Sequence, residues 1–358
     1  MVISLCGNLI TSFEFCYLRR NPSIYAIFQK SHFRRVNMHK EFKGWLEFLG
    51  FDEPIELTQL HGDENSKRYY RIENSTKSFV ALDASSNKEI IPEFVGIGMR
   101  FKKSKMRTPM VRSFELHKGF MLLEDVGSTH LYDKCVDAGA GAYYEKAIKT
   151  LVQMQTSPTI GMKPHDAMPM LEEMNSMLEW YYKAHLGKTL ECVEGQQLLK
   201  MFSLIAKEVL AQPQETFVHG DYHSKNLMLD SEDEMVILDF QDARVGSLTY
   251  DLASLLYDAH VALDKRERKR FIKIFKTLKG IEVEDETFMR WLDFTAIQRS
   301  LTQLGTLARL SIEEQKKGYM EHTPLVRQYI LDIAEKYPEL EQLVLMLTPL
   351  EEDSLGFF

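Results

Sequence analysis

The spacing of apolar residues changes character at Glu124–Gly127, and this change limits the folds open to the chain. Before this point, most apolar residues fall in short runs of strand length. The expected strands are Ile55–Leu60, Arg68–Glu73, Phe79–Leu82, Val111–Leu116 and Phe120–Leu123. A helix is expected over Ile91–Phe101, and another begins after Met38 and closes at Gly50. The pattern predicts a small antiparallel sheet with one helix.

After Gly127, long helical periods dominate. The expected helices are Ala142–Gln155, Ala167–His185, Gly195–Ala211, Tyr250–Leu263, Lys265–Leu278, Glu286–Leu310 and Pro324–Lys336. One strand-rich island, Thr216–Phe240, interrupts them. The order of elements therefore predicts an α+β protein of two unequal lobes, with an N-lobe at 38–125 and a C-lobe at 126–358.

Residues 1–37 do not fit this plan. The apolar stretch Met1–Phe15 is followed, rather than preceded, by Arg19 and Arg20, which is the reverse of a secretory signal. Helical spacing begins only after Met38. We therefore expect 1–37 to be either a disordered extension or translation from an upstream start.

Composition excludes several classes of protein. The 358 residues carry a net charge of −8, which gives no general attraction to nucleic acid. The four cysteines form no CxxC pair, and no apolar run has membrane-spanning length. The basic run Lys265–Arg270 precedes an apolar stripe and predicts a solvated amphipathic helix. We expect a cytoplasmic monomer with no nucleic-acid or membrane partner.

The candidate chemistry lies in the strand-rich island. Asp221 and Asn226 are five residues apart on one loop, and Asp239 follows the next apolar strand. A tight hairpin would bring the three side chains together. Phosphoryl transfer needs a carboxylate to orient and deprotonate the attacking hydroxyl, and oxygen ligands to hold Mg²⁺ on the nucleotide phosphates. The alternative is that both aspartates only cap turns.

Sequence resemblance supports the chemical reading. His219-Gly220-Asp221 with Asn226, followed by Leu238-Asp239-Phe240, resembles the catalytic and metal-binding segments of kinase-like folds. Tyr250-Asp251-Leu252-Ala253 is similar to the aminoglycoside phosphotransferase family. Wider similarity from Met38 onward, including Gln298-Arg299, looks like the anomeric N-acetylmuramate/N-acetylglucosamine kinases of bacterial cell-wall recycling.

This resemblance implies a bilobal protein-kinase-like fold with a nucleotide-binding N-lobe and a C-lobe that holds the catalytic loop and the sugar site. It implies Asp221 as the catalytic base, and Asn226 and Asp239 as Mg²⁺ ligands, with ATP as the phosphate donor. His219 would orient the catalytic loop, and Asp251 would brace it through hydrogen bonds.

The nucleotide end departs from the kinase pattern. The chain has no GxxxxGK, and the His61–Lys67 turn holds one glycine, with Ser66 small enough to let backbone amides approach phosphate. In kinase-like folds the third strand usually carries a lysine that pairs with the nucleotide phosphates. This sequence has Asp83 at that position. Charge would then come from Lys67, Arg68 or Arg71, although each fits a solvated strand equally well. Backbone groups of Glu124 and Val126 are expected to form hydrogen bonds with adenine.

The acceptor side is defined less sharply. His223, Gln241 and Asp242 lie close to the expected base in sequence. Trp180 is a candidate sugar platform, although most helix aromatics belong to the core. Arg299 is a candidate partner for the substrate carboxylate that N-acetylmuramate carries, with a structural ion pair as the alternative.

These observations predict ATP-dependent phosphorylation of the anomeric hydroxyl of N-acetylmuramate, N-acetylglucosamine or both. The rival on the same fold is a kinase for an aminoglycoside or another hydroxyl acceptor. A rival of a different class is a non-catalytic nucleotide-binding regulator, which Asp83 in place of the lysine suggests.

Overall fold

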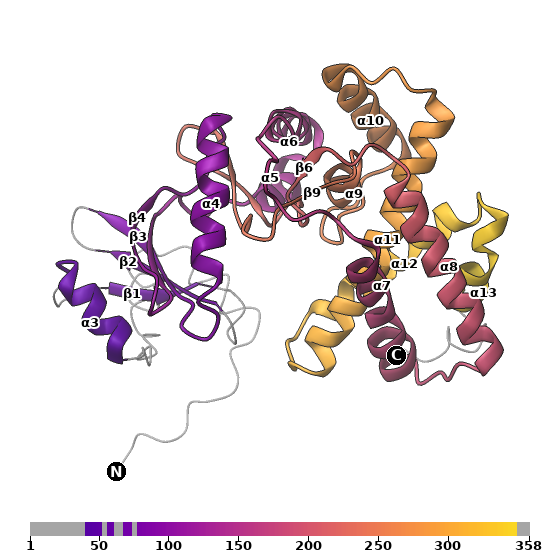
Figure 1. Ribbon diagram of the computed structural model, residues 1–358, viewed down its shortest axis with the longest axis horizontal. Helices are drawn as coiled ribbons and strands as arrows, with labels where there is room; N and C mark the ends of the chain where they lie inside the picture. The colour runs from indigo at the N-terminus through magenta and orange to yellow at the C-terminus, as the bar shows by residue number, and fades with distance from the viewer. Residues whose placement is uncertain (1–39, 52–55, 61–66, 74–76, 349–358) are drawn as a thin grey trace, which may run out of the picture.

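The computed structural model describes residues 40–51, 56–60, 67–73 and 77–348. A five-stranded sheet with helix α4 beside it lies at one end of the molecule, and helices form most of the rest (Figure 1). The predicted α+β architecture of two unequal parts is therefore confirmed. The expectations for residues 1–37 and for Ser66 lie outside the described residues.

The sheet is antiparallel, in the order β1-β2-β3-β5-β4. Its strands are β1 (Glu56–Gln59), β2 (Arg68–Glu73), β3 (Ser78–Asp83), β4 (Val111–Glu115) and β5 (Phe120–Glu124). Helix α3 (Lys40–Phe48) buries Phe42, Trp45 and Leu46 against one face of the sheet. Helix α4 (Ile90–Lys103) joins the main core through Phe94 and Phe101. The sheet thus has α3 on one side and faces the larger part of the protein on the other.

The register of β2 and β3 decides which side chains reach that second face. Neighbouring side chains alternate along a strand, so Tyr70 and Ala81, both packed with α3, share one face. Val80 lies on the opposite face, and Leu82 is the next residue of β3 to point that way. Asp83 therefore faces the α3 side, where its carboxylate accepts from Arg68 at 2.9 Å.

Alternating helices and irregular turns build the larger part. Its α-helices are α5 (Leu131–Ala138), α6 (Gly141–Met154), α7 (Ala167–Ser176), α8 (Cys192–Leu210), α9 (Tyr250–Leu256), α10 (Lys265–Lys279), α11 (Asp285–Ile312), α12 (Thr323–Ala334) and α13 (Glu341–Leu347). A π-helix, η1 (Met177–His185), and two 3₁₀ turns, η2 (Tyr319–His322) and η3 (Pro338–Leu340), complete it. Helix α11 is the central element, because it contacts η1, α7, α8, α9 and α12.

Two short antiparallel pairs of strands support the loops between these helices. Strand β6 (Thr216–Val218) pairs antiparallel with β9 (Arg244–Gly246). Strand β7 (Leu227–Leu229) pairs antiparallel with β8 (Met235–Ile237). The loops after β6 and β8 therefore emerge from a fixed, buried framework.

Two predicted helices differ from the structure. The helix predicted over Ala167–His185 divides into α7 and the π-helix η1. The helix predicted over Tyr250–Leu263 ends at Leu256, because the buried Asp258 carboxylate binds the amide of Ser224 (2.9 Å) and ties the following segment to another loop. Among the described helices, none combines the length and apolar character that crossing a membrane requires.

Candidate active site

The loop between β6 and β7 is held from below by one buried carboxylate. Asp251, on α9, accepts the backbone N–H of His219 at 2.7 Å and that of Gly220 at 3.0 Å. Gly220 has φ of +93°, a conformation that favours glycine. Burial raises the pKa of Asp251, while His219 and the two backbone N–H donors act against that rise. Asp251 therefore lies where a brace for this loop is needed.

The buried imidazole of His219 joins two loops. Its Nε2 lies 2.8 Å from the carbonyl oxygen of Leu238, and its Nδ1 accepts the backbone N–H of Asp221 at 3.2 Å. This pair of bonds places the ring proton on Nε2. Because both nitrogens are engaged and the residue is 1% exposed, His219 positions the loop and does not face a reactant.

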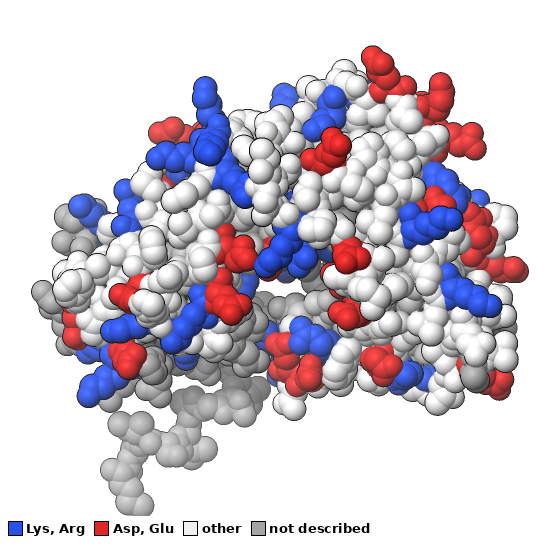
Figure 2. Space-filling model, in the orientation of Figure 1, with Lys and Arg blue, Asp and Glu red and all other residues white. Residues whose placement is uncertain are grey.

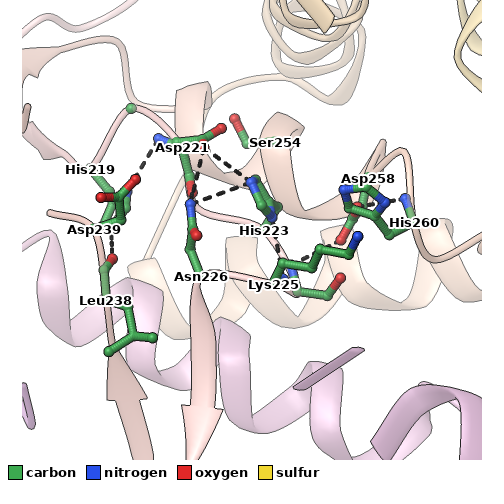
Figure 3. A network of polar contacts seen from close by, with 12 residues as sticks. His219, Asp221, His223, Lys225, Asn226, Leu238, Asp239, Ser254, Asp258 and His260 are labelled. Carbon is green, nitrogen blue, oxygen red and sulfur yellow. Dashed lines mark hydrogen bonds and ion pairs between the residues drawn. The ribbon is translucent and has the colours of Figure 1, made fainter. Parts of the chain in front are cut away.

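Asp221 stands at the centre of the polar network drawn in Figure 3. Its Oδ2 lies 3.0 Å from Nε2 of His223 and accepts from Nδ2 of Asn226 at 3.0 Å. Its Oδ1 accepts from Nη2 of Arg299 at 3.1 Å. Burial alone would raise the pKa of Asp221, but His223 and Arg299 outweigh burial and hold that pKa well below its usual range. The side chain is half exposed, so an ionised carboxylate of fixed orientation is open to the solvent on one side.

His223 is the cation beside this carboxylate. Burial favours the neutral ring, but the contact with Asp221 and the charge of Asp258 outweigh burial and raise the pKa of His223 to about 9. This shift favours the protonated imidazole. It offers a positive charge next to Asp221.

Arg299 is held by side chains of the protein itself. Its side chain is 7% exposed on α11, and its three nitrogen groups donate to Asp221, to Tyr250 Oη at 3.0 Å and to Ser254 Oγ at 3.1 Å. Of the two roles expected for Arg299, these contacts are those of a structural ion pair with the protein's own aspartate.

Asn226 and Asp239 sit side by side at the ends of β7 and β8. The N–H of Leu238 donates to the carbonyl of Asn226 at 2.9 Å, which sets Asp239 next to the loop. Nδ2 of Asn226 also donates to the backbone carbonyl of Asp221 at 3.0 Å, so Oδ1 is the amide atom that faces outward. Asp239 has φ of +53°, an uncommon conformation for a residue with a side chain.

The carboxylate of Asp239 already has a cationic neighbour. Its Oδ1 accepts from Nζ of Lys67 at 3.0 Å and from Nε2 of Gln241 at 3.0 Å. Nε2 of Gln241 also donates to Asp242 at 3.0 Å, and Oε1 of Gln241 is buried with no partner among the described residues. Gln241 and Asp242 thus lie beside Asp239.

A cavity of about 450 Å³ opens above these residues. The β2–β3 face contributes Tyr69 and Val80, and Asn226 and Asp239 lie at its other wall. Lys and Arg side chains gather with Asp and Glu around the hollow between the sheet and the helices (Figure 2). The size suits a small organic ligand, and the donor set at one wall is made of oxygen atoms.

The segment that joins sheet and helices lines the same cavity. Glu124 and Val126 both lie on its wall, as an adenine-binding segment requires. The expectation for Glu124 needs correction in one respect, because its N–H already donates to Met110 O at 2.8 Å. Arg71 grips Asp125 through Nε at 2.7 Å and Nη2 at 3.0 Å. Arg71 therefore holds this segment in place through Asp125.

Two other expected residues lie away from the cavity. Arg68 pairs with Asp83 on the α3 side of the sheet, so the expectation that it binds nucleotide is corrected by the register of β2. Trp180 lies on η1, partly buried against the main core, and belongs to neither the cavity wall nor the hydrogen-bonded network around Asp221.

Residues that the sequence analysis did not single out complete the site. Asp258 accepts the N–H of Ser224 at 2.9 Å and that of His260 at 2.8 Å, which makes it a second buried brace under the loop. Asp258 lies beyond the end of α9 at Leu256, so helical spacing from Asp251 does not predict its position. Tyr250 and Ser254 likewise carry no sequence signal for their contact with Arg299.

Comparison with known proteins decides the family. The model described as "Phosphotransferase enzyme family" matches residues 56–292. The chain belongs to this family. This phosphotransferase transfers phosphate to a hydroxyl acceptor, and its fold is that of the aminoglycoside phosphotransferases.

Curated relatives match the phosphotransferase over most of its length. The "N-acetylmuramate/N-acetylglucosamine kinase" of Pseudomonas aeruginosa is 30% identical over 322 residues, covering 87% of this chain and 92% of that protein. The protein of the same name from Pseudomonas putida is 30% identical over 301 residues, covering 82% and 88%.

Solved structures with low identity share the fold. Choline kinase LicA from Streptococcus pneumoniae superposes with a TM-score of 0.59 at 14% identity, covering 82% of the phosphotransferase and 98% of LicA. A thermostable mutant of aminoglycoside phosphotransferase APH(4)-Ia gives 0.55 at 11% identity, covering 88% and 100%.

Proposed function

We propose that this phosphotransferase uses ATP to phosphorylate the anomeric hydroxyl of N-acetylmuramate, N-acetylglucosamine or both. The acceptor class rests on the names of relatives that match at 30% identity over most of both chains. The observation that carries the chemistry is the oriented carboxylate of Asp221, bonded to Asn226 beside the cavity that Asn226 and Asp239 line. The proposed enzyme works in the cytoplasm, as a monomer.

The residues at the cavity wall fit a magnesium–nucleotide complex. Asn226 Oδ1 and the Asp239 carboxylate are oxygen donors of the kind that Mg²⁺ prefers, and a lysine ammonium already stands at 3.0 Å from Asp239. Asn226 and Asp239 are therefore the residues that would hold the ion. When bound, Mg²⁺ offsets negative charge on the nucleotide phosphates.

Asp221 orients the acceptor hydroxyl and takes its proton. Because His223 and Arg299 stabilise the ionised form, Asp221 is a weak base. In the loose transition state of phosphoryl transfer the hydroxyl loses its proton late, so positioning matters more than base strength. The anomeric hydroxyl is the most acidic hydroxyl of a sugar, since the ring oxygen withdraws electron density. A weak, fixed carboxylate suits that hydroxyl.

Side chains near Asp239 supply the remaining contacts we propose for the sugar. His223 lies next to the carboxylate of Asp221, and Gln241 and Asp242 bring further donors and acceptors beside Asp239. The buried Oε1 of Gln241, which has no partner among the described residues, is a ready acceptor for a sugar hydroxyl or a water. Asp83, which suggested the regulator alternative, pairs with Arg68 on the α3 side of the sheet and does not face the cavity.

Parallel phosphate transfer tests the proposal. The purified chain, ATP and Mg²⁺ are incubated with N-acetylmuramate, N-acetylglucosamine, kanamycin or choline, and ³¹P NMR locates the new phosphate. We expect a sugar 1-phosphate with one or both amino sugars. Phosphorylation of kanamycin or choline alone, or of another sugar hydroxyl, would contradict the proposed acceptor. Binding of ATP without transfer to any of the four would favour a regulator.

A further inference from the structure

The sheet offers no cation to the cavity from its third strand. Val80 lies on the cavity wall, and the next residue of β3 on that face is Leu82, which is fully buried in the core. Glu93, on α4, pairs with Lys163 at 3.0 Å, and both side chains are at least half exposed. A phosphate-binding charge must therefore come from another element.

Lys67 supplies a cation at that point of the cavity. It immediately precedes β2, on the same face as Tyr69 and Arg71, and its side chain is only 16% exposed. It lines both the 450 Å³ cavity and a neighbouring polar cavity of about 230 Å³. Arg71 is committed to Asp125 and to the carbonyl of Gly127, so it is not available in the same way.

The partner of Lys67 is the residue that we assign to magnesium. Nζ lies 3.0 Å from Oδ1 of Asp239. A divalent ion bound to the same carboxylate would repel the ammonium, because two cations cannot share one oxygen at hydrogen-bond distance without a large Coulomb cost. The four-carbon stem of lysine lets Nζ move by several ångströms while the backbone stays in place.

We infer that Lys67 exchanges partners when nucleotide binds. In the free protein it neutralises Asp239. In the complex, Mg²⁺ takes its place on Asp239, and Nζ binds the nucleotide phosphates, the charge that β3 does not provide. This inference rests on the proposed function, because it assumes that the cavity takes a magnesium–nucleotide complex.

Two binding measurements on Lys67→Met test the exchange. The first is calorimetric titration of ADP in EDTA, where no metal can bridge protein and phosphate. Loss of a charge-assisted bond to phosphate should weaken ADP binding by about 10- to 100-fold. The second is Mn²⁺ binding without nucleotide, followed by EPR. Loss of the competing ammonium should tighten Mn²⁺ binding by about two- to fivefold, the scale of a half-exposed ion pair.

Two further variants separate charge from packing. Lys67→Arg keeps the charge and should retain most of the ADP affinity. Lys43→Met makes the same substitution on α3, where the lysine forms an exposed pair with Glu47, and should change neither measurement. Thermal unfolding of each variant shows whether it is folded.

Opposite effects on the two ligands would support the exchange, since a purely structural role of Lys67 would weaken both. Unchanged ADP affinity in EDTA, or Mn²⁺ binding that is not tighter, would overturn it. If wild-type protein binds ADP and Lys67→Met behaves as expected, but no sugar is phosphorylated, the acceptor assignment fails and the exchange stands. Wild-type protein that binds no ADP would overturn both proposals.

Discussion

Arg299 donates from Nη2 to Oδ1 of Asp221 across 3.1 Å, although the two residues are 78 positions apart. The guanidinium is buried on α11, while the carboxylate is half exposed. A buried cation thus fixes the orientation and charge of a carboxylate that has one side free. We treat Arg299 as a positioning residue for the proposed base.

Removal of Arg299 should slow turnover and change its pH dependence. Arg299→Met removes a charge-assisted bond and should lower kcat by about 10- to 100-fold. Because Arg299 helps to lower the pKa of Asp221, its loss should raise that pKa and move the acidic limb of the pH–rate profile to higher pH. Arg299→Lys should recover part of the rate.

A matched substitution controls for damage to α11. Arg309→Met, near the end of the same helix, removes pairs with Glu313 and Glu314 and should leave kcat unchanged. If Arg299→Met loses rate with no shift of the acidic limb, its effect is on folding of the helix and not on Asp221.

Replacement of Asp221 tests the base directly. Asp221→Asn keeps the size of the side chain but removes proton acceptance, and positioned general bases typically contribute ~10²–10⁴ in rate. We expect kcat to fall by that order while ADP affinity, measured by calorimetry, stays within about threefold. Wild-type turnover in this variant would remove Asp221 from the mechanism.

Asp251 should matter for both stability and rate. Asp251→Asn replaces one of two acceptors of backbone N–H groups with an NH₂ that faces a donor, which costs about 1–3 kcal/mol in the free energy of unfolding. Urea denaturation followed by circular dichroism measures this loss. Asp233→Asn, which removes a surface pair with Lys146, should be close to neutral. Equal stability of the two variants would contradict the bracing role.

His165 predicts how stability responds to acid. Burial, with the nearby charges of Arg244 and Arg299, lowers the pKa of His165 to about 3. In the unfolded chain this histidine takes up a proton near pH 6.5, so it favours the unfolded state increasingly as pH falls from about 6.5 toward 3. Free energies of unfolding at pH 7.5, 6 and 5 should therefore decline less steeply in His165→Leu than in the wild type. Parallel declines would show that other groups dominate in this range.

Local spacing allowed the sequence to predict the core of the candidate site. Asp221 and Asn226 share one loop, and Asp239 follows the adjacent strand, so two short-range patterns were enough to predict that they lie together. The partner of Arg299 depends on how α11 crosses α9 and the loop, which no local pattern encodes. The sequence therefore left two roles open for Arg299, a partner of a substrate carboxylate and a structural ion pair.

The assignment of Asp83 shows a different limit. A strand shows its side chains alternately to two faces, so an error of one residue in register moves a side chain to the other face. The sequence placed Asp83 in the position of the missing lysine, whereas Val80 on the cavity wall makes Leu82 its next neighbour on that face. The strand itself, Ser78–Asp83, was predicted to within one residue at each end.

The length of α11 couples the packing of distant helices to the position of Arg299. One continuous rod of 28 residues is embedded among η1, α7, α8, α9 and α12, and it carries Arg299 near its midpoint. If repacking along α11 shifts this helix slightly, Arg299 moves with it and displaces Oδ1 of Asp221, to which it donates. Substitutions made to change the acceptor specificity can therefore lower kcat even where they contact neither nucleotide nor sugar.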